Sequence, residues 1–309
     1  MRSRILVLDG AMGTMLQQRN LAAQDFGGSK YEGCNELLVT TRPDVVLDIH
    51  RAYLQAGADI IMTNTFGGTP VVLAEYGVDH RALELSSRAA ELAREAADQF
   101  STTARPRFVA GSVGPTTKAI SVTGGISFRD LMAGYAEQLR GLLEGDVDLF
   151  VLETCQDTRN VKAALIALEE VFAEFATTRP IVISCTIEPT GTMLAGQAED
   201  AFYASVLHAG PLAVGLNCAT GPEFMTDHLR SLHEMADCAV SCHPNAGLPD
   251  EDGRYSETPD SLAAALARFA DAGWLNIVGG CCGTTPDHIR DIAALASKYQ
   301  PRPLSETLA

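Results

Sequence analysis

The sequence has no long hydrophobic run and comparatively little basic charge. Its longest apolar stretches are five or six residues, far short of the ~20 that a membrane-spanning helix requires. Lys and Arg total 23 against 39 Asp and Glu, so the formal net charge is −16. A surface this negative repels nucleic-acid backbones and anionic lipids. We therefore expect neither a nucleic-acid partner nor a membrane partner.

The sequence also lacks the features of an exported protein. The N-terminal apolar run Ile5–Leu8 ends at Asp9 and is too short for a signal peptide. We therefore expect a reducing, cytoplasmic environment, in which the eight cysteines are buried apolar residues, metal ligands or catalytic groups rather than disulfides. Hydrophobic residues make up 46% and charged residues 20%. These are ordinary values for a globular protein and exclude disorder of the whole chain.

The length of 309 residues allows either two average domains or one α/β barrel. No linker, low-complexity run or break in composition divides the chain, which favours a single domain over residues 1–300. The tail 301–309, PRPLSETLA, is expected to leave this domain as an extension or as the start of a linker to a further domain. On this view the chain is a fragment of a longer protein.

Eight short, nearly all-apolar segments alternate with amphipathic helical stretches, which is typical of parallel strands buried on both faces. Eight strand–helix units in a chain of this length predict a closed (β/α)8 TIM barrel with its active site at the C-terminal ends of the strands. An open doubly wound sheet remains the alternative. The predicted strands are Ile5–Leu8, Asp59–Thr63, Arg107–Gly111, Leu149–Glu153, Ile181–Thr186, Ala213–Asn217, Cys238–Cys242 and Asn276–Gly279.

Helix boundaries are marked by proline and glycine. The apolar spacing between Phe128 and Leu143 predicts a helix with one buried stripe. Proline is tolerated in the first turn of a helix, and glycine is favoured just after the last turn. Four prolines are therefore expected at helix starts, and four glycines at helix ends: Pro43, Pro222, Pro259, Pro286, Gly57, Gly145, Gly210 and Gly273.

Three cysteines fall at the predicted ends of two strands. Cys218 ends the sixth strand, while Cys281 and Cys282 end the eighth, so all three belong to the same mouth of a barrel. Neighbouring residues of a regular strand point to opposite faces. The flanking glycines of GGCCG allow the bend that would turn both thiols inward. Three converging thiolates with one free position suit Zn²⁺.

Other interpretations of these cysteines remain open at this point. Cys281 and Cys282 are also consistent with a redox disulfide or with inert core cysteines. A closed structural zinc site would need a fourth ligand, for which Cys155 and Cys242 are the candidates. The same glycine-rich segment before Pro286 is also compatible with a phosphate-binding loop, although that leaves the two thiols unexplained. His243 is interpreted as a structural histidine.

These motifs together resemble the homocysteine S-methyltransferase family, which also uses a barrel fold. The resemblance covers nearly the whole chain and rests on DGAMGT at the first strand end, GLNC at the sixth and GGCCG at the eighth. Within the family, DGAMGTM, ADIIMTNTF, GLNCATGP, HPNAGLP and LNIVGGCCGTTP are most similar to the N-terminal homocysteine-binding module of cobalamin-dependent methionine synthase.

The resemblance implies a methyltransferase whose chemistry depends on zinc. It implies that Cys218, Cys281 and Cys282 hold Zn²⁺ and that Asn245 is a weak fourth ligand, which the substrate displaces. The thiol of homocysteine has a pKa near ~8.5, as free cysteine does, and only the thiolate is a good nucleophile. Zinc deprotonates a bound thiol at neutral pH. We expect no catalytic residue beyond this metal site.

The resemblance also assigns the amino-acid end of homocysteine. By analogy, Asp9 and Glu153, which end the first and fourth strands, bind the substrate ammonium. The amide groups of the turn Gly10, Ala11, Gly13 and Thr14 are candidates for binding the carboxylate, because such turns concentrate N–H donors. Asn217 is interpreted as support for the residues of the mouth.

Methylcobalamin, bound by a separate module, is the methyl donor that this resemblance implies, and methyltetrahydrofolate then regenerates it. The partners are accordingly the folate and cobalamin domains of a longer chain or of separate proteins. One alternative is a standalone homocysteine S-methyltransferase that uses S-methylmethionine or betaine. The single tryptophan, Trp274, lies away from the predicted mouth, which weakens that alternative because such cations favour aromatic pockets. A second alternative is a zinc-stabilised binding module without catalysis.

Overall fold

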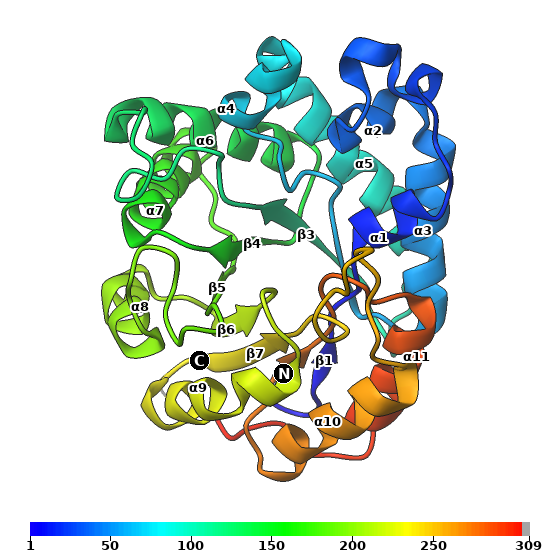
Figure 1. Ribbon diagram of the computed structural model, residues 1–309, viewed down its shortest axis with the longest axis vertical. Helices are drawn as coiled ribbons and strands as arrows, with labels where there is room; N and C mark the ends of the chain where they lie inside the picture. The colour runs from blue at the N-terminus through cyan, green and yellow to red at the C-terminus, as the bar shows by residue number, and fades with distance from the viewer. Residues whose placement is uncertain (305–309) are drawn as a thin grey trace.

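The computed structural model describes residues 1–304, which form a barrel of parallel strands surrounded by helices (Figure 1). The strand order is β1-β8-β7-β6-β5-β4-β3-β2, and every neighbouring pair is parallel. A bridge between Leu8 and Ile60 closes the ring between β1 and β2. The predicted (β/α)8 barrel is therefore confirmed, and the open doubly wound sheet is wrong. The strands are β1 Leu6–Val7, β2 Ile60–Met62, β3 Phe108–Val113, β4 Leu149–Cys155, β5 Ile181–Cys185, β6 Ala213–Asn217, β7 Ala239–His243 and β8 Ile277–Val278.

Helices fill the connections between strands and form the outer layer (Figure 1). The α-helices are α1 Met12–Gln17, α2 Leu38–Thr41, α3 Pro43–Ala56, α4 Pro70–Leu73, α5 Ala82–Phe100, α6 Phe128–Glu144, α7 Thr158–Glu174, α8 Glu199–Val206, α9 Pro222–Met235, α10 Pro259–Asp271 and α11 Pro286–Ala296. Short 3₁₀ helices are η1 Ala23–Phe26, η2 Ser29–Tyr31, η3 Asn35–Leu37, η4 Ala74–Tyr76, η5 Asp79–Arg81 and η6 Leu207–Ala209.

The predicted helix boundaries agree closely with the observed ones. The four prolines each occupy the first position of a helix, in α3, α9, α10 and α11. Gly57 and Gly210 end their helices in the left-handed conformation that glycine adopts without strain. Gly145 differs, because it ends α6 with a φ of −82°.

Two layers of apolar side chains hold the barrel together. The larger layer fills the space between the outside of the sheet and the helices. A smaller cluster fills the inside of the barrel, so the barrel is a packed core and not a pore. The inner cluster consists of Leu8, Ile60, Ala110, Leu149, Val151, Val182, Ala213, Ala239 and Ile277. This packing leaves no room for a ligand inside the barrel itself.

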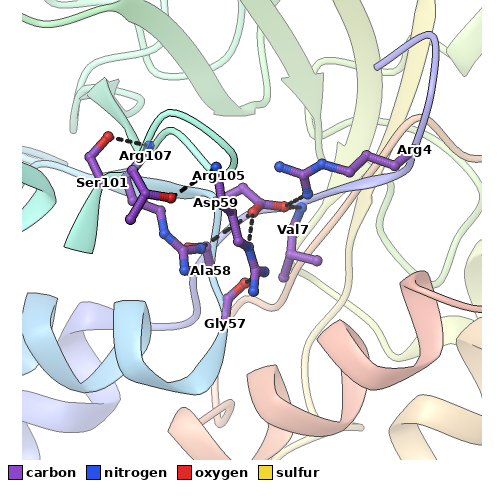
Figure 2. A network of polar contacts seen from close by, with 9 residues as sticks. Arg4, Val7, Gly57, Ala58, Asp59, Ser101, Arg105 and Arg107 are labelled. Atoms are coloured by element: carbon purple, nitrogen blue, oxygen red, sulfur yellow. Dashed lines mark hydrogen bonds and ion pairs between the residues drawn. The ribbon is translucent and has the colours of Figure 1, made fainter.

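The N-terminal end of the barrel is joined by a network around Asp59, which is fully buried (Figure 2). One carboxylate oxygen accepts a hydrogen bond from the amide of Val7 and pairs with Arg4. The other oxygen pairs with Arg105 at 3.1 Å and with Arg107 at 3.3 Å. Asp59 thus links the starts of β1, β2 and β3, where a single bridge joins β1 to β2.

The last described residues return to the barrel. The guanidinium of Arg302 donates hydrogen bonds to carbonyl oxygens of His233, Ala236 and Cys238, and Leu304 packs against the inner cluster. Residues 305–309 of the predicted tail lie outside the described residues, and the linker role stays a prediction. Within residues 1–304, no helix is both long and apolar enough to span a membrane.

Candidate metal and substrate site

The structure brings the thiols of Cys218, Cys281 and Cys282 together at the C-terminal end of the barrel. Cys218 follows β6 directly, and the other two belong to the turn after β8. The three sulfur atoms all lie within 4.8 Å of one another, and the Sγ atoms of Cys218 and Cys282 are 3.8 Å apart. Among the described residues, these three form the one group of His, Cys, Asp and Glu side chains with metal-ligand spacing.

The spacing of these thiols fits a tetrahedral zinc ion. Zinc–thiolate bonds of ~2.3 Å at tetrahedral angles place two sulfur atoms about 3.8 Å apart, the separation found between Cys218 and Cys282. Hydrogen bonds from Cys218 and Cys281 lower the pKa of Cys282 to about 3, whereas hydrogen bonds with Cys218 and Cys282, together with burial, raise the pKa of Cys281. The protein alone therefore favours one thiolate here, and a divalent cation would supply the charge needed for three.

The local backbone is bent so that each thiol faces the same point. Cys218 and Ala219 have φ values of 62° and 53°, which place two non-glycine residues in the left-handed region. Gly283 has a φ of 81°, and a side chain at Gly280 would lie 2.5 Å from Thr284. Backbone strain of this kind is concentrated at functional sites. The predicted glycine-assisted bend after the eighth strand is present.

Asn245 and Asn217 hold the cysteine segments in place. The side-chain oxygen of Asn245 accepts a hydrogen bond from the amide of Cys282 at 3.0 Å. Asn217 forms two hydrogen bonds with Thr154, and its amide nitrogen lies 3.9 Å from the Cys281 sulfur. Asn217 thereby connects the segment that carries the cysteines to the end of β4. The role of Asn245 as a displaceable fourth ligand stays a prediction.

Asp9 and Glu153 form a second part of the site, beside the cysteines. Both carboxyl groups are buried at the mouth of the barrel. Asp9 accepts a hydrogen bond from the amide of Met62, but its other oxygen has no partner within the described residues. Glu153 accepts a hydrogen bond from the hydroxyl of Ser112 at 2.5 Å. Each group has more hydrogen-bonding capacity than the protein fills.

Burial controls the charge of these two acids. Desolvation raises the pKa of Asp9 well above its usual value, and the nearby Glu153 charge raises it further. Desolvation likewise raises the pKa of Glu153 to about 7. An ammonium group placed between the two would reverse these shifts, because an opposite charge favours the ionised form. The pair is therefore suited to bind a cation such as a substrate ammonium.

The predicted carboxylate-binding turn lies against the cysteine segment. The amide of Ala11 donates to the hydroxyl of Thr284 at 3.2 Å, and the hydroxyl of Thr14 accepts from the amide of Gly283 at 3.0 Å. The Ala11 amide is therefore already engaged. The first-turn amides of α1, which have no partner within the helix, remain for an anion. They include the amide of Gly13, whereas Gly10 contributes mainly a close approach to Thr284.

One cavity of about 530 Å³ is lined by the three cysteines, Asn217, both acids and the turn before α1, but not by Asn245. It reaches beyond the predicted residues to Glu36, Phe66, His243 and Tyr255. Sequence reasoning did not identify Glu36, Phe66 or Tyr255 as site residues. Glu36 and Tyr255 belong to connections without a strand-end motif at their position, and Phe66 ends the motif ADIIMTNTF but was given no role. Burial lowers the pKa of His243 to about 4, so this histidine is neutral. The interpretation of His243 as a packed residue is consistent with its environment.

The remaining five cysteines are buried and unpaired. The sulfur of Cys242 lies 3.9 Å from the sulfur of Met225, and that of Cys155 lies 3.6 Å from the carbonyl oxygen of Leu152. Neither joins the cluster of three thiols within the described residues. The alternative of a closed site with Cys155 or Cys242 as fourth ligand therefore has no geometric support.

Comparisons with known proteins agree with this site. The sequence model of the family described as homocysteine S-methyltransferase matches residues 6–296. The chain belongs to the homocysteine S-methyltransferase family. The membership confirms the resemblance derived from the strand-end motifs. It also confirms methyl transfer to homocysteine as the family's activity.

Solved structures of one member of this family are similar over nearly the whole chain. The oxidized form of the homocysteine methyltransferase MmuM from Escherichia coli has 26% sequence identity and a TM-score of 0.77, and the match covers 94% of this chain and 95% of that one. The metallated form has 25% identity and the same TM-score, and the match covers 95% of this chain and 96% of that one. A relative with the same extent thus exists in a metal-bound state, and the three-cysteine cluster is where this chain could hold a metal.

Proposed function

We propose that this protein binds homocysteine at the three-cysteine site and presents its sulfur as a thiolate for methylation to methionine. The observation that carries this proposal is the convergence of the Cys218, Cys281 and Cys282 thiols in the cavity that also contains Asp9 and Glu153. A zinc ion held by the three thiolates would supply the positive charge that keeps the substrate sulfur deprotonated at neutral pH.

The other groups of the cavity bind and orient the substrate. Asp9 and Glu153 hold the ammonium, which gives each of these buried carboxylates the counter-charge that the protein lacks. The amides at the start of α1 hold the substrate carboxylate. Asn217 and Asn245 keep the cysteine segments in position, and Asn245 is the neutral oxygen ligand that substrate would displace. With both ends of homocysteine fixed, its sulfur is directed at the cysteine cluster.

For the methyl donor we propose methylcobalamin, carried by a separate module, with methyltetrahydrofolate restoring the methyl group afterwards. The support is the similarity of the five strand-end motifs to the homocysteine-binding module of methionine synthase. The partners would then be cobalamin and folate domains, in the same chain or in separate proteins. In this role the site exposes the substrate sulfur at an open mouth, which a large cofactor module can approach.

A standalone enzyme that uses a small sulfonium or betaine donor is the second candidate. A specific observation favours it: the match to the E. coli homocysteine methyltransferase covers 95% of that chain, so a single barrel of this size makes up nearly all of that relative. The cavity also contains Glu36 and the exposed ring of Phe66, a carboxylate and an aromatic group near which a cation could bind.

One experiment separates the two donors. The zinc-loaded protein is incubated with homocysteine and, in parallel, with methylcobalamin, S-methylmethionine or betaine, and methionine is measured against an enzyme-free blank. Methionine from methylcobalamin alone supports the methionine synthase module. Methionine from a sulfonium or from betaine supports the standalone enzyme and excludes methylcobalamin as the required methyl donor. Metal-dependent homocysteine binding without methionine from any donor would support a binding module instead.

The metal site is tested by removing each ligand in turn. Cys218→Ala, Cys281→Ala and Cys282→Ala are each expected to lose bound zinc and turnover. Cys242→Ala is the matched control, because that thiol is buried but lies outside the cluster. Full activity in any of the three ligand variants would contradict the proposed site.

A further inference from the structure

Tyr255 lies over the cysteine segment, in the part of the β7–α10 loop that follows the motif HPNAGLP. The loop connects β7 to α10 and folds into a short hairpin, in which Pro249 and Tyr255 pair in an antiparallel bridge. Residues 251–254 at the tip are exposed, whereas Tyr255 is half-buried and lines the same cavity as the three cysteines. In an otherwise exposed loop, this side chain turns toward the candidate metal site.

The ring of Tyr255 rests directly on the backbone of Gly283. A Cβ atom at position 283 would lie 2.3 Å from Cγ and 2.5 Å from Cβ of Tyr255, so the ring occupies the space that any other side chain would need. Gly283 also has a φ of 81°, which other residues rarely adopt. The turn after Cys282 is thus shaped to receive this ring.

One backbone hydrogen bond connects the β7–α10 loop to Cys282, and a second joins the two ends of this loop. The amide of Ala246 donates to the carbonyl oxygen of Cys282 at 2.9 Å, and the amide of Glu257 donates to the carbonyl oxygen of Ala246 at 3.0 Å. Tyr255 and Cys282 line the same cavity, and the Tyr255 ring lies against Gly283, the residue that follows Cys282. A tyrosine hydroxyl carries its proton at neutral pH, so toward a thiolate it can act only as a donor.

We propose that Tyr255 is a positioning residue of the metal site, whose ring holds the Cys281–Gly283 turn and covers Cys282 while its hydroxyl donates a hydrogen bond to the Cys282 sulfur. This inference rests on the proposed function, because it concerns the ligands of the same site. Groups that hydrogen-bond to metal ligands orient them and tune the metal, and their removal typically lowers metal affinity or activity by ~10–100-fold.

The test compares Tyr255→Phe, which removes only the hydroxyl, with Tyr255→Ala, which also removes the ring. Tyr203→Phe is the matched control, because the Tyr203 hydroxyl accepts a hydrogen bond from the amide of Asp237 away from the cysteines. Zinc affinity is measured by competition with a chromophoric chelator. We expect a loss of about 10-fold for Tyr255→Phe, a larger loss for Tyr255→Ala, and wild-type affinity for Tyr203→Phe.

Two readouts separate positioning from a general loss of stability. In the cobalt-loaded protein, Tyr255→Phe is expected to shift the thiolate-to-metal absorption band, which a purely structural change elsewhere would leave in place. In the metal-free protein, Tyr255→Ala is expected to increase the rate at which Cys282 reacts with a thiol reagent. Wild-type zinc affinity and an unchanged cobalt spectrum in Tyr255→Phe would overturn the role of the hydroxyl. Unchanged thiol reactivity in Tyr255→Ala would overturn the covering role of the ring.

These readouts do not depend on methyl transfer. A wild-type protein that binds metal but forms no methionine from any donor would contradict the proposed function, while the Tyr255 variants would still decide the inference. A wild-type protein that binds no metal would remove the hydroxyl role together with the metal site. The thiol reactivity of Tyr255→Ala would then decide whether the ring covers Cys282.

Discussion

Buried carboxylates lie at both ends of this barrel, and their surroundings are opposite. Asp59 at the N-terminal end faces three guanidinium groups, from Arg4, Arg105 and Arg107 (Figure 2). Asp9 and Glu153 at the C-terminal end are just as inaccessible, yet the part of the chain that the structure describes places no Lys or Arg in the lining of their cavity. A buried carboxylate therefore has more cationic neighbours than it needs at the N-terminal end of the barrel, and the buried carboxylates at the C-terminal end have none in their cavity lining.

On the proposed function, the difference distinguishes a structural acid from acids that bind substrate. A buried charge is costly unless it is paired. Asp59 is paired within the protein and therefore contributes to the junction of three strands. Asp9 and Glu153 are unpaired and have raised pKa values, so the free protein is destabilised by them at neutral pH. A substrate ammonium would complete the pairing, which is the reason to place homocysteine there.

The largest expected effect is the loss of stability when the structural acid is removed. Asp59→Asn leaves three arginines without their shared carboxylate, and breaking a buried pair in this way typically costs about 3–5 kcal/mol. We expect the free energy of unfolding, measured by chemical denaturation, to fall by an amount in this range. The kcat/KM of the folded fraction should be unchanged, because Asp59 is at the opposite end from the cavity. A variant as stable as the wild type would show that the network is dispensable.

The opposite pattern is expected when a binding acid is neutralised. Glu153→Gln keeps a partner for Ser112 but removes the charge that we propose binds the ammonium, so the KM for homocysteine should rise on the order of 100-fold. The free energy of unfolding should rise or stay constant, because an uncompensated buried charge is gone. Asp9→Asn should behave in the same way. A Glu153→Gln protein that loses stability but keeps its KM would place Glu153 with Asp59 as a structural acid.

The sequence predicted the barrel well because each strand is specified locally. All eight predicted strands are present, and the boundaries differ mostly by one or two residues. The boundaries differ where tertiary contacts, and not the local sequence, determine the strand ends. For example, β1 and β8 contain only two residues each. The residues after β8 bend away to form the cysteine turn. The network of Asp59 was not predictable, because its partners lie 46 to 55 residues away in the chain.

The site was predictable to the extent that it lies at strand ends. Cys218, Cys281 and Cys282 could be assigned to one mouth because barrel geometry brings the ends of strands six and eight together. Tyr255 could not, because its contact with Gly283 depends on the path of a loop. The pattern GGCCG indicated a bend in the backbone, yet nothing in it indicated which side chain would occupy the space above Gly283.

A pH titration tests the comparison by changing the charge of the proposed binding acids without a mutation. Because the pKa of Glu153 is raised to about 7, this group becomes protonated as the pH falls below 7 and can no longer attract an ammonium. The KM for homocysteine should rise by up to about 10-fold per pH unit below 7. In the substrate-free protein the sign reverses, since a raised carboxyl pKa makes folding more favourable as the pH falls from 7 toward the unfolded value.

Two controls isolate the carboxylates from other titrating groups. The deaminated analogue 4-mercaptobutyrate lacks the ammonium, so its KM should not show the Glu153-dependent rise. Glu153→Gln should show a flatter profile for homocysteine itself. Equal pH dependence for homocysteine and its deaminated analogue would mean that the effect arises at the thiols and not at the acids.

The smallest effect is expected from removing one of the three arginines around Asp59 at the N-terminal end of the barrel. The side chain of Arg4 is 39% exposed, and Asp59 would keep Arg105 and Arg107 as partners after Arg4→Gln. An exposed ion pair contributes roughly 0–1 kcal/mol, so chemical denaturation should show a loss below about 1 kcal/mol that shrinks further in high salt. Arg290→Gln, which removes a surface pair with Asp287, is the matched control. A loss as large as that of Asp59→Asn would mean that all three arginines are required together, and the excess of cations at this end would then be a structural requirement.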